Sequence, residues 1–422
     1  MLDRKYIEVI DEEMFSGKIN GLMTYVIPKK GYSKSFAMLT VRYGSNDIKF
    51  SIDENEMKEY PLGIAHFLEH KLFEEKDGNI FDRFALLGSS PNAYTNFNAT
   101  AYYFTATNSF EDNLELLIKF VFNPYFTKEN VEKEKGIIEQ EIKMYDDNPG
   151  FRVYFGALQS MYEHNPIKND IAGTVLSIKE ITPELLNECY NTFYRPENMT
   201  LVVVGDVDIE KVSSIASKLV PINRGSISFS KFKYKNEKGI CMKERNSKMG
   251  LSIPNFIIGF KEDLEEDQNK LILKKKISMD IISKMFLGKS SDIYEVLYSK
   301  GLINESFEYE YTVQKEYSHF IIGGESKDPI AVKDFINVAL NKIKYKDINT
   351  KDFERIKKVL VGSFISRFNS IESIGNSLSE YFLMKIDIFD YYEVLKSITV
   401  KDIQNQMEKI FIEENCVISV VN

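Results

Sequence analysis

Two stretches of the sequence, 181–205 and 398–422, share a common pattern although they lie half a chain apart. When they are aligned, Thr182 matches Thr399, an offset of 217 residues (399 − 182). In both stretches a helical pattern leads through a short acidic turn containing Asn into a strand of β-branched residues. Similarity at so long a period predicts a duplicated domain and not a solenoid of short repeats.

The duplication divides a chain of 422 residues, which is too long for one ordinary core. We predict homologous halves at 1–220 and 245–422, joined by a linker at 221–244 that is rich in Ser, Lys, Asn and Gly. Strand and helix patterns are mixed within each half. This mixture predicts an α+β fold in which each half is a sheet covered by helices.

The first half carries the clearest element patterns. A strand is predicted at 36–43 and a helix at 61–74. A turn is predicted at 89–92, where Ser, Pro and Asn cluster, ahead of an alternating strand at 97–107. A helical period covers 127–146.

Composition argues against several classes of partner and location. Lys and Arg number 54 against 63 Asp and Glu, a net charge of −9, so nucleic acid is not an expected partner. No apolar run reaches the roughly 18–20 residues of a membrane span, and the charged N-terminal segment does not fit a signal peptide. Cys189, Cys241 and Cys416 form neither a disulfide framework nor a CxxC metal motif and fit a reducing compartment. We therefore expect a cytoplasmic protein without membrane attachment.

Two of the four histidines fall in one short motif, HFLEH at 66–70. On a helix, residues four apart share a face, so His66 and His70 can present their imidazoles to one metal ion. Glu69 lies at the rim of that face, where its carboxylate can accept a proton from an attacking water molecule. The alternative is a helix with two surface histidines and an incidental glutamate.

A third ligand is needed, because catalytic zinc usually has three protein ligands and one open position. In the helix predicted around 131–145, Glu134 and Glu141 share one stripe with Ile137, Ile138 and Tyr145, whereas Glu139 lies on an opposite, charged stripe. A carboxylate on a buried face is costly unless it is paired or metal-bound. Glu134 and Glu141 are therefore both candidate ligands, and the alternative is that they pair with buried cations.

The spacing of these residues resembles that of a known family. Glu141 follows the HxxEH motif by 71 residues (141 − 70), inside the segment EKGIIEQEI, as in the inverzincin zinc metallopeptidases of the pitrilysin and insulin-degrading type. The segment at 144–149, MYDDNP, is most similar to the bacterial YmfH-like, processing-peptidase-like branch of that family.

The resemblance implies a site and an architecture. It implies that Zn2+ is the cofactor and that His66, His70 and Glu141 are its ligands. It further implies that Glu69 is the catalytic base of peptide-bond hydrolysis and that Glu134 supports a ligating histidine. Family members are built from two homologous halves with mostly antiparallel sheets, arranged as a clamshell.

The resemblance also implies how substrate is held. In the family, the strand that follows the motif pairs along its edge with an extended peptide, and here Asn92 and Ala93 lie at its start. We expect these two residues to bind substrate through main-chain hydrogen bonds. The alternative is an ordinary Pro-Asn turn that opens a sheet strand.

The second half departs from the family pattern. It has no HxxEH motif at 279–288, and the segment 297–306 lacks the Arg that active members carry in the corresponding setting with a Tyr. We therefore predict a heterodimer in which a related subunit supplies the substrate-binding Arg and Tyr, with a homodimer as the other arrangement. The alternatives to a peptidase are a non-catalytic scaffold or partner subunit of the same fold, and a hydrolase of small amides.

For the other two histidines, His164 and His319, we predict structural roles. His164 precedes Asn-Pro in a predicted loop, and His319 lies in an alternating strand. Neither has metal-ligating neighbours in the sequence, so we predict no catalytic role for them.

Overall fold

The computed structural model describes residues 2–53, 55–76, 78–222, 227–234, 237–264, 269–344 and 347–422. The chain divides into two compact units, each built from separate segments. Unit 1 contains Met1–Ile142, Asp170–Phe232 and Ile365–Ile388. Unit 2 contains Lys143–Asn169, Lys233–Phe364 and Phe389–Asn422.

The predicted halves and linker, 1–220, 245–422 and 221–244, follow the order of the sequence, whereas the compact units do not. The boundaries of the halves therefore stay a prediction. Within the predicted linker, positions 223–226 and 235–236 lie outside the described residues.

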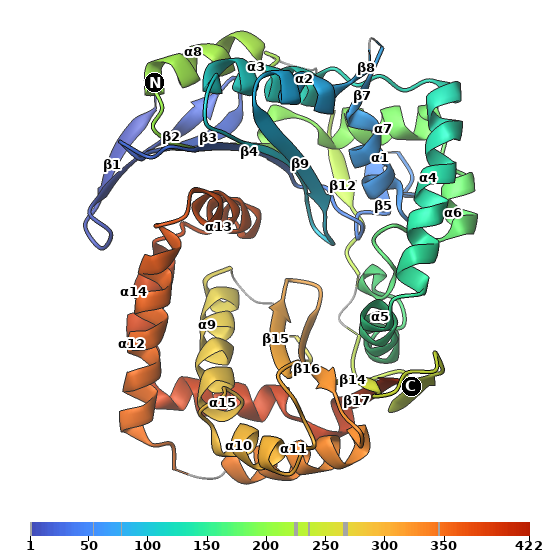
Figure 1. Ribbon diagram of the computed structural model, residues 1–422, viewed down its shortest axis with the longest axis vertical. Helices are drawn as coiled ribbons and strands as arrows, with labels where there is room; N and C mark the ends of the chain where they lie inside the picture. Colours follow the sequence, from blue (N-terminus) through green and yellow to red (C-terminus); the bar gives the residue numbers. More distant parts are fainter. Residues whose placement is uncertain are drawn as a thin grey trace. The chain divides into compact units, whose positions relative to one another are not determined.

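A seven-stranded sheet forms the centre of unit 1 (Figure 1). Its strands, in spatial order, are β1 (Asp3–Ile7), β2 (Glu12–Ile19), β3 (Leu22–Pro28), β11 (Met199–Gly205), β4 (Ser35–Val41), β10 (Thr100–Ala106) and β9 (Ser89–Thr95). Helices α2 (Ile80–Leu86), α3 (Phe110–Phe122) and α8 (Ile209–Leu219) lie on one face, and α13 (Ile371–Met384) packs against β4 and β11 on the other. The remaining elements of unit 1 are α1 (Ile64–Leu72), α6 (Val175–Lys179), α7 (Pro183–Phe193), η2 (Pro196–Asn198), most of α4 (Lys128–Asp146), and the short strands β5 (Lys49–Ile52), β6 (Lys58–Glu59), β7 (Glu74–Glu75), β8 (Gly78–Asn79) and β12 (Phe229–Lys231).

Unit 2 is built around a five-stranded sheet. Its order is β13 (Glu244–Ser247), β17 (Cys416–Val421), β14 (Asn255–Lys261), β16 (Ser318–Glu325) and β15 (Glu308–Val313). Helix α5 (Pro149–Met161) packs against β13, β14 and β17, and α9 (Asn269–Phe286) packs against β15. The other helices are η1 (Pro166–Lys168), α10 (Asp292–Ser299), α11 (Pro329–Lys344), most of α12 (Thr350–Arg367), α14 (Asp390–Ser397), α15 (Val400–Ile410) and η3 (Glu413–Asn415). Each large sheet has one parallel pair and is otherwise antiparallel, so the predicted α+β class with mostly antiparallel sheets is confirmed.

The duplicated segment is folded identically in both units. Helix α7 and helix α15 are offset by 217 residues (400 − 183), as are the turns η2 and η3 that follow them. Thr182 and Thr399 cap the two helices, each accepting a backbone N–H in the first turn. The strands that follow, β11 and β17, each lie parallel to one neighbour and antiparallel to the other. The local pattern predicted from the sequence is therefore present twice.

Most predicted elements of the first half occur within a few residues of their expected bounds, but the turn at 89–92 is wrong. Those residues belong to strand β9, and the turn lies at 97–98 instead, so that β10 begins at Thr100. Pro91 misled the prediction because proline is typical of turns. It is tolerated here because β9 is the last strand of its sheet, where one edge needs no ladder hydrogen bonds.

Close backbone packing fixes the start of α1. Gly63, the residue before the helix, has φ 84°, and an added Cβ would lie 2.2 Å from the carbonyl oxygen of Ala172. Gly173 is packed in the same way. Its φ is 80°, and an added Cβ would lie 2.4 Å from the carbonyl oxygen of Leu62. Only glycine fits both conformations and both contacts, so this pair holds the helix against the 172–173 loop.

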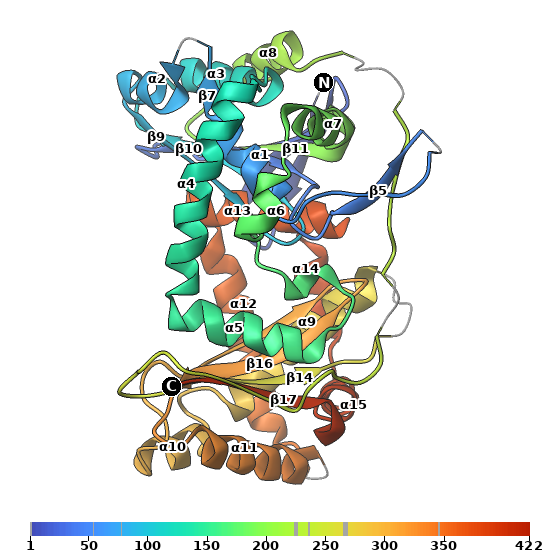
Figure 2. The ribbon, with the colours of Figure 1, turned by 90° about the vertical axis from the view of Figure 1, so that its right-hand side faces the viewer.

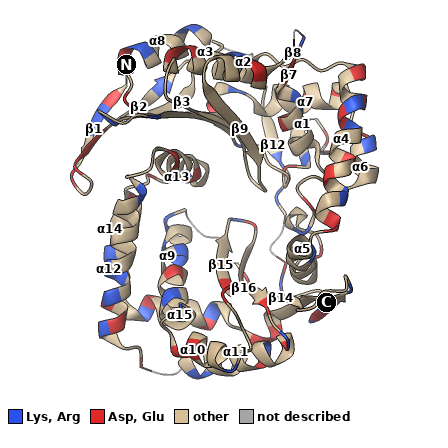
Figure 3. Ribbon diagram, in the orientation of Figure 1, with Lys and Arg blue, Asp and Glu red and all other residues tan. Residues whose placement is uncertain are grey.

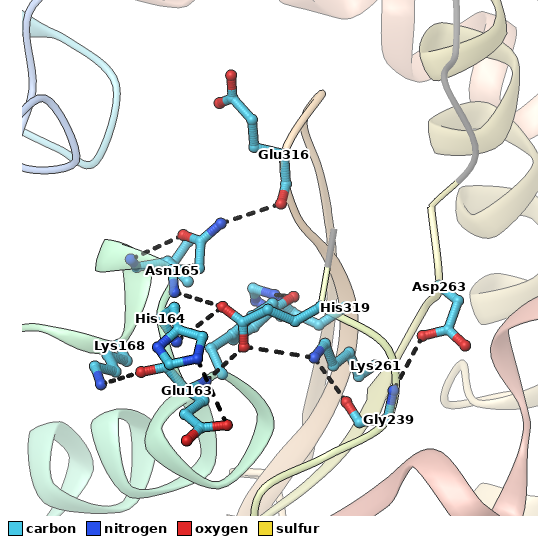
Figure 4. Close-up of polar contacts among 12 residues, drawn as sticks. Glu163, His164, Asn165, Lys168, Gly239, Lys261, Asp263, Glu316 and His319 are labelled. Atoms are coloured by element: carbon cyan, nitrogen blue, oxygen red, sulfur yellow. Dashed lines mark hydrogen bonds and ion pairs between the residues drawn. The ribbon is translucent and has the colours of Figure 1, made fainter. Parts of the chain in front are cut away.

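His164 takes part in a loop clamp of unit 2 and not in a metal site (Figure 4). The Glu237 carboxylate accepts the backbone N–H groups of Glu163, His164 and Asn165 at 2.6, 2.9 and 2.5 Å. Figure 4 labels these three neighbouring loop residues. The imidazole of His164 itself is 75% exposed, 3.8 Å from the Glu163 carboxylate. The structural interpretation of this histidine is consistent with these contacts.

His319 is completely buried in unit 2. Its Nδ1 lies 3.1 Å from the hydroxyl of Tyr162, which itself donates to the carbonyl oxygen of Ser318 at 2.9 Å. Nδ1 must therefore carry the proton, and Nε2 is buried without a partner among the described residues. Lys261 is the cross-strand neighbour of His319. Burial lowers the pKa of His319 to about 3.

The buried His319 predicts an acid-sensitive unit 2. Between about pH 6.5 and pH 3 the unfolded chain binds a proton that the folded chain excludes, so stability falls as the pH falls through this window. In metal-free protein, we expect His319→Phe, which keeps a ring beside Tyr162, to lose less stability between pH 7 and pH 5 than the wild type. Urea unfolding at both pH values measures this. His164→Gln serves as the control and should behave as the wild type, and an unchanged pH dependence in His319→Phe would contradict the assignment.

Candidate metal centre

Helix α1 presents both histidines of the motif on one face. His66 and His70 are one turn apart, and their ring centroids lie 4.5 Å from each other. His66 is buried, and the side chain of His70 is 26% exposed. The expected spacing on a single helical face is therefore present.

Helix α4 lies beside α1 in both views of the ribbon (Figure 1 and Figure 2). Its start is fixed by reciprocal capping: Thr127 Oγ1 accepts the N–H of Asn130 at 3.2 Å, and Asn130 Oδ1 accepts the N–H of Thr127 at 2.9 Å. From this start, Glu134 and Glu141 are directed towards α1, where both contact its histidines.

Glu141 faces both imidazoles. Its Oε1 lies 3.7 Å from Nε2 of His66, and its Oε2 lies 3.5 Å from Nε2 of His70. Ligand atoms about 2.0–2.2 Å from one tetrahedral zinc ion lie roughly 3.3–3.6 Å apart, slightly beyond good hydrogen bonds. The three ligand atoms all lie within 4.8 Å of one another, and no other such group of three occurs among the described ranges. The residues present therefore fit a zinc ion with three protein ligands.

Glu134 makes a different contact from Glu141. Its Oε1 lies 3.1 Å from Nδ1 of His70, on the opposite side of the ring from Glu141. A proton on Nδ1 leaves the lone pair of Nε2 available to a metal ion. The two carboxylates that the helical stripe left as equal candidates are thus distinguished by which imidazole nitrogen they face.

The electrostatics of the histidines favour this arrangement. Burial, followed by the neighbouring His70, lowers the pKa of His66 to about 4, so His66 is neutral, which is the ligating form. Burial alone would lower the pKa of His70, but the hydrogen bond to Glu134 and the surrounding carboxylates outweigh it and raise that pKa. Burial likewise opposes ionisation of Glu134, yet its bonds to His70 and Lys71 keep its pKa below the usual value.

Glu69 is buried on α1 and points towards the end of strand β9. Its Oε2 accepts a hydrogen bond from Thr95 Oγ1 at 2.6 Å. Burial raises the pKa of Glu69 to about 7, although Thr95 and His70 oppose that rise. Thr95 is in turn 3.3 Å from Thr100 Oγ1, which donates to the carbonyl oxygen of Tyr43 at 2.9 Å. The carboxylate is therefore held by the Thr95 hydroxyl, whose single proton it accepts.

The predicted stripe of α4 is correct for the glutamates but wrong for Ile137, which is 49% exposed. The buried stripe runs at spacing four through Asn130, Glu134, Ile138 and Ile142, and Glu141 lies on its edge. Lys and Glu residues colour the rest of the helix (Figure 3), in agreement with a solvated opposite stripe. The buried face of α4 is narrower than the stripe assumed from the sequence. It follows a four-residue spacing and therefore excludes Ile137.

Asn92 and Ala93 lie in β9, the end strand, which has a described neighbour on one side only. The N–H of Asn96 donates to the carbonyl of Ala99 at 2.9 Å, and hydrogen-bonded pairs alternate along an antiparallel ladder. Asn92 therefore directs its backbone groups towards β10, and Ala93 directs its own towards the open edge. In agreement, the Ala93 N–H donates to Asn92 Oδ1 at 2.8 Å.

Sequence reasoning missed two residues of the centre, Thr95 and Lys71. Thr95 lies two residues after Ala93 but was not singled out, because a single hydroxyl residue forms no recognisable motif. Lys71 directly follows the motif and is completely buried, whereas a lysine in sequence normally indicates a solvated position.

Among the described residues, no helix combines the length and apolar character needed to cross a bilayer.

Comparisons with known proteins identify the family of the chain. The family profile described as insulinase, peptidase family M16, matches residues 34–175, and the profile described as the M16 inactive domain matches residues 180–360. The uncharacterized zinc protease YmfH of Bacillus subtilis is 42% identical over 410 residues, 95% of each chain. The zinc protease PqqE of Helicobacter pylori is 24% identical over 382 residues, 85% of this chain and 82% of that one.

A solved structure shows the same fold along the whole chain. The crystal structure of a putative M16-like peptidase from Alicyclobacillus acidocaldarius superposes with a TM-score of 0.93 at 31% identity, covering 97% of this chain and 98% of that one. The resemblance inferred from HxxEH and Glu141 is thereby confirmed. The chain belongs to the insulinase-type peptidase family M16.

Proposed function

We propose that this chain is a zinc-dependent endopeptidase that cleaves peptides or unfolded segments. The observation that carries the proposal is the convergence of three ligand atoms within 4.8 Å, with Glu69 on the same helix as two of them. Zn2+ is assigned to His66, His70 and Glu141, and relatives named zinc proteases support that choice of metal. When bound, zinc acts as a Lewis acid that polarises the peptide carbonyl and makes water more acidic.

The residues of the chain have the following roles. Glu69 takes a proton from the attacking water and delivers it to the leaving amine nitrogen as the C–N bond breaks. Because Oε2 already accepts from Thr95, we assign this transfer to Oε1. Glu134 holds the His70 ring through Nδ1. We further propose that the zinc-bearing half spans 1–220, the linker 221–244 and the half without a metal motif 245–422.

Substrate is proposed to bind along the open edge of β9. Ala93 directs its backbone to that edge, and Thr95 links the same strand to Glu69. An extended peptide added there gains main-chain hydrogen bonds while its scissile bond approaches the base. Asn92 contributes by releasing the Ala93 N–H when a peptide replaces its side-chain oxygen.

We further propose that a related subunit completes the substrate-binding site. The segment 297–306 contains no Arg, so we infer that a heterodimer partner, or a second copy, supplies the substrate-binding Arg and Tyr. Cys189, Cys241 and Cys416 are free thiols, which fits a reducing compartment, and we propose the cytoplasm. The missing Arg also favours a second candidate function, a non-catalytic partner subunit.

Replacement of Glu69 tests the catalytic proposal. Glu69→Gln should retain zinc, because Glu69 is no ligand, and should reduce cleavage by about 10³-fold, because a positioned base contributes roughly 10²–10⁴-fold. Digestion of a peptide mixture, followed by mass spectrometry, measures this with the pure chain and with a related subunit added. Glu75→Gln, at a surface pair with Arg83, is the control. Cleavage by Glu69→Gln at the wild-type rate would refute the role, and zinc-loaded wild type that never cleaves would favour the non-catalytic subunit.

The metal assignment predicts different effects on zinc affinity for Glu141 and Glu139, two glutamates of helix α4. Glu141→Gln should weaken zinc binding by more than about 100-fold, because loss of a ligand exceeds the 10–100-fold cost of losing a supporting partner. Glu139→Gln should leave the affinity unchanged. Competition with a chromogenic chelator measures both dissociation constants. Equal affinities in the two variants would show that Glu141 is not a ligand.

The edge-strand proposal predicts a selective effect of Ala93→Pro. Proline removes an outward N–H without breaking the pairing to β10, as Pro91 already does two residues earlier. One lost hydrogen bond of about 1 kcal/mol should raise KM roughly five-fold, with zinc affinity unchanged. Steady-state kinetics on a cleaved peptide provides the measurement, and Ala93→Ser, which keeps the N–H, is the control. An unaltered KM in folded Ala93→Pro would exclude this edge as the binding site.

A further inference from the structure

Lys71, the residue after the second histidine of the motif, is completely buried. A lysine is rarely buried, because its charge loses hydration unless it is paired. Such a residue in a metal-binding helix therefore requires buried or half-buried partners. The contacts of its Nζ identify them.

The Nζ of Lys71 forms two ion pairs. One is to Glu74 Oε2, just after the helix, and the other is to Glu134 Oε2 at 3.4 Å. The second oxygen of the same Glu134 carboxylate, Oε1, lies 3.1 Å from Nδ1 of His70. One carboxylate thus bridges Lys71 and a metal-ligating histidine, with one oxygen for each.

This bridge has a consequence for His70. To ligate through Nε2, the ring needs its proton on Nδ1 and an acceptor that faces that nitrogen. Glu134 can supply the acceptor only while its carboxylate plane is fixed, and a carboxylate with one partner can rotate. A second partner on Oε2 removes that freedom.

We propose that Lys71 is a positioning residue of the metal centre: its ammonium group fixes the Glu134 carboxylate, which in turn fixes the ring of His70. The inference rests on the proposed function, because it assumes that His70 ligates zinc. Lys71 itself touches neither the metal position nor a substrate, and its effect passes entirely through Glu134.

Charge balance supports the same role. Glu134 faces His70 and Glu141 faces both imidazoles, so two carboxylates gather at the site before a cation binds. The buried ammonium of Lys71 offsets part of this repulsion from within the protein, where salt screens it little. It does so on the side away from the ligand atoms, and therefore does not compete for the metal position.

Unit 2 provides a matched comparison. Helix α9 precedes the β15–β16 hairpin as α1 precedes β9–β10, and it also carries a buried lysine. Lys275 pairs with buried Glu262, with 3.1 Å between Nζ and Oε1. Glu262 is held further by Ser318 at 2.7 Å and Gln406 at 3.3 Å, without histidine. Lys275 is therefore a buried lysine whose loss should disturb packing but not zinc binding.

The test measures zinc affinity by chelator competition on the full chain. Lys71→Met keeps the apolar stem and removes the charge, and we expect the zinc dissociation constant to rise about 10–100-fold. In a Glu134→Gln background the same replacement should add less than about two-fold, because both act through one carboxylate. Lys275→Met should leave the constant within two-fold of the wild type. Cobalt-loaded Lys71→Met should also show an altered visible absorption spectrum, which a loss of stability alone would not produce.

The outcomes separate this inference from the proposed function. Wild type that binds no zinc defeats both. Wild type that binds zinc, with Lys71→Met unchanged or with a full extra effect in the Glu134→Gln background, overturns only the role of Lys71. If Lys71→Met does not fold, Lys71→Gln takes its place. A dissociation constant raised about three-fold or more then supports the inference, and a smaller change contradicts it.

Discussion

The centre depends on the approach of helix α4 to helix α1, which places the Glu141 carboxylate between two imidazoles. Neither helix could hold the proposed zinc ion alone, because α1 would supply two nitrogen ligands and α4 the oxygen. The approach is fixed at some distance from the ligands. Gly63 locks the start of α1 against the 172–173 loop, and the Thr127–Asn130 caps fix the start of α4. A small shift at either end would move a ligand by more than a zinc–ligand bond tolerates.

The sequence predicted which residues meet at the candidate site better than it predicted their surroundings. His66, Glu69 and His70 follow from local spacing, and Glu141 from the helical stripe combined with family resemblance. Pro91 was misread because whether a strand lies at a sheet edge depends on topology, which no local pattern contains. Lys71 was overlooked for a similar reason: its burial is decided by Glu74 and Glu134, which only the folded chain brings to it.

The two units show how one topology supports two kinds of polar core. In unit 1, helix α1 carries two imidazoles that face the Glu141 carboxylate of α4 around the proposed cation position. In unit 2 the corresponding helix α9 carries Lys275, whose own positive charge is neutralised by Glu262. A buried carboxylate needs a cation in both places. Where no metal ion is held, the positive charge can come from a buried lysine side chain.

An open edge strand beside the proposed catalytic centre exposes the molecule to a hazard, since unpaired backbone groups recruit strands from any chain, including neighbouring copies. Strand β9 carries its own protection. Pro91 offers no donor at one outward position, and the amide oxygen of Asn92 occupies the donor at the next. A peptide that binds at this edge must displace that oxygen. A peptide that matches the site well can offset this small cost with its other contacts, whereas a poorly matched peptide cannot. The edge can thus stay available for the proposed substrate without promoting aggregation.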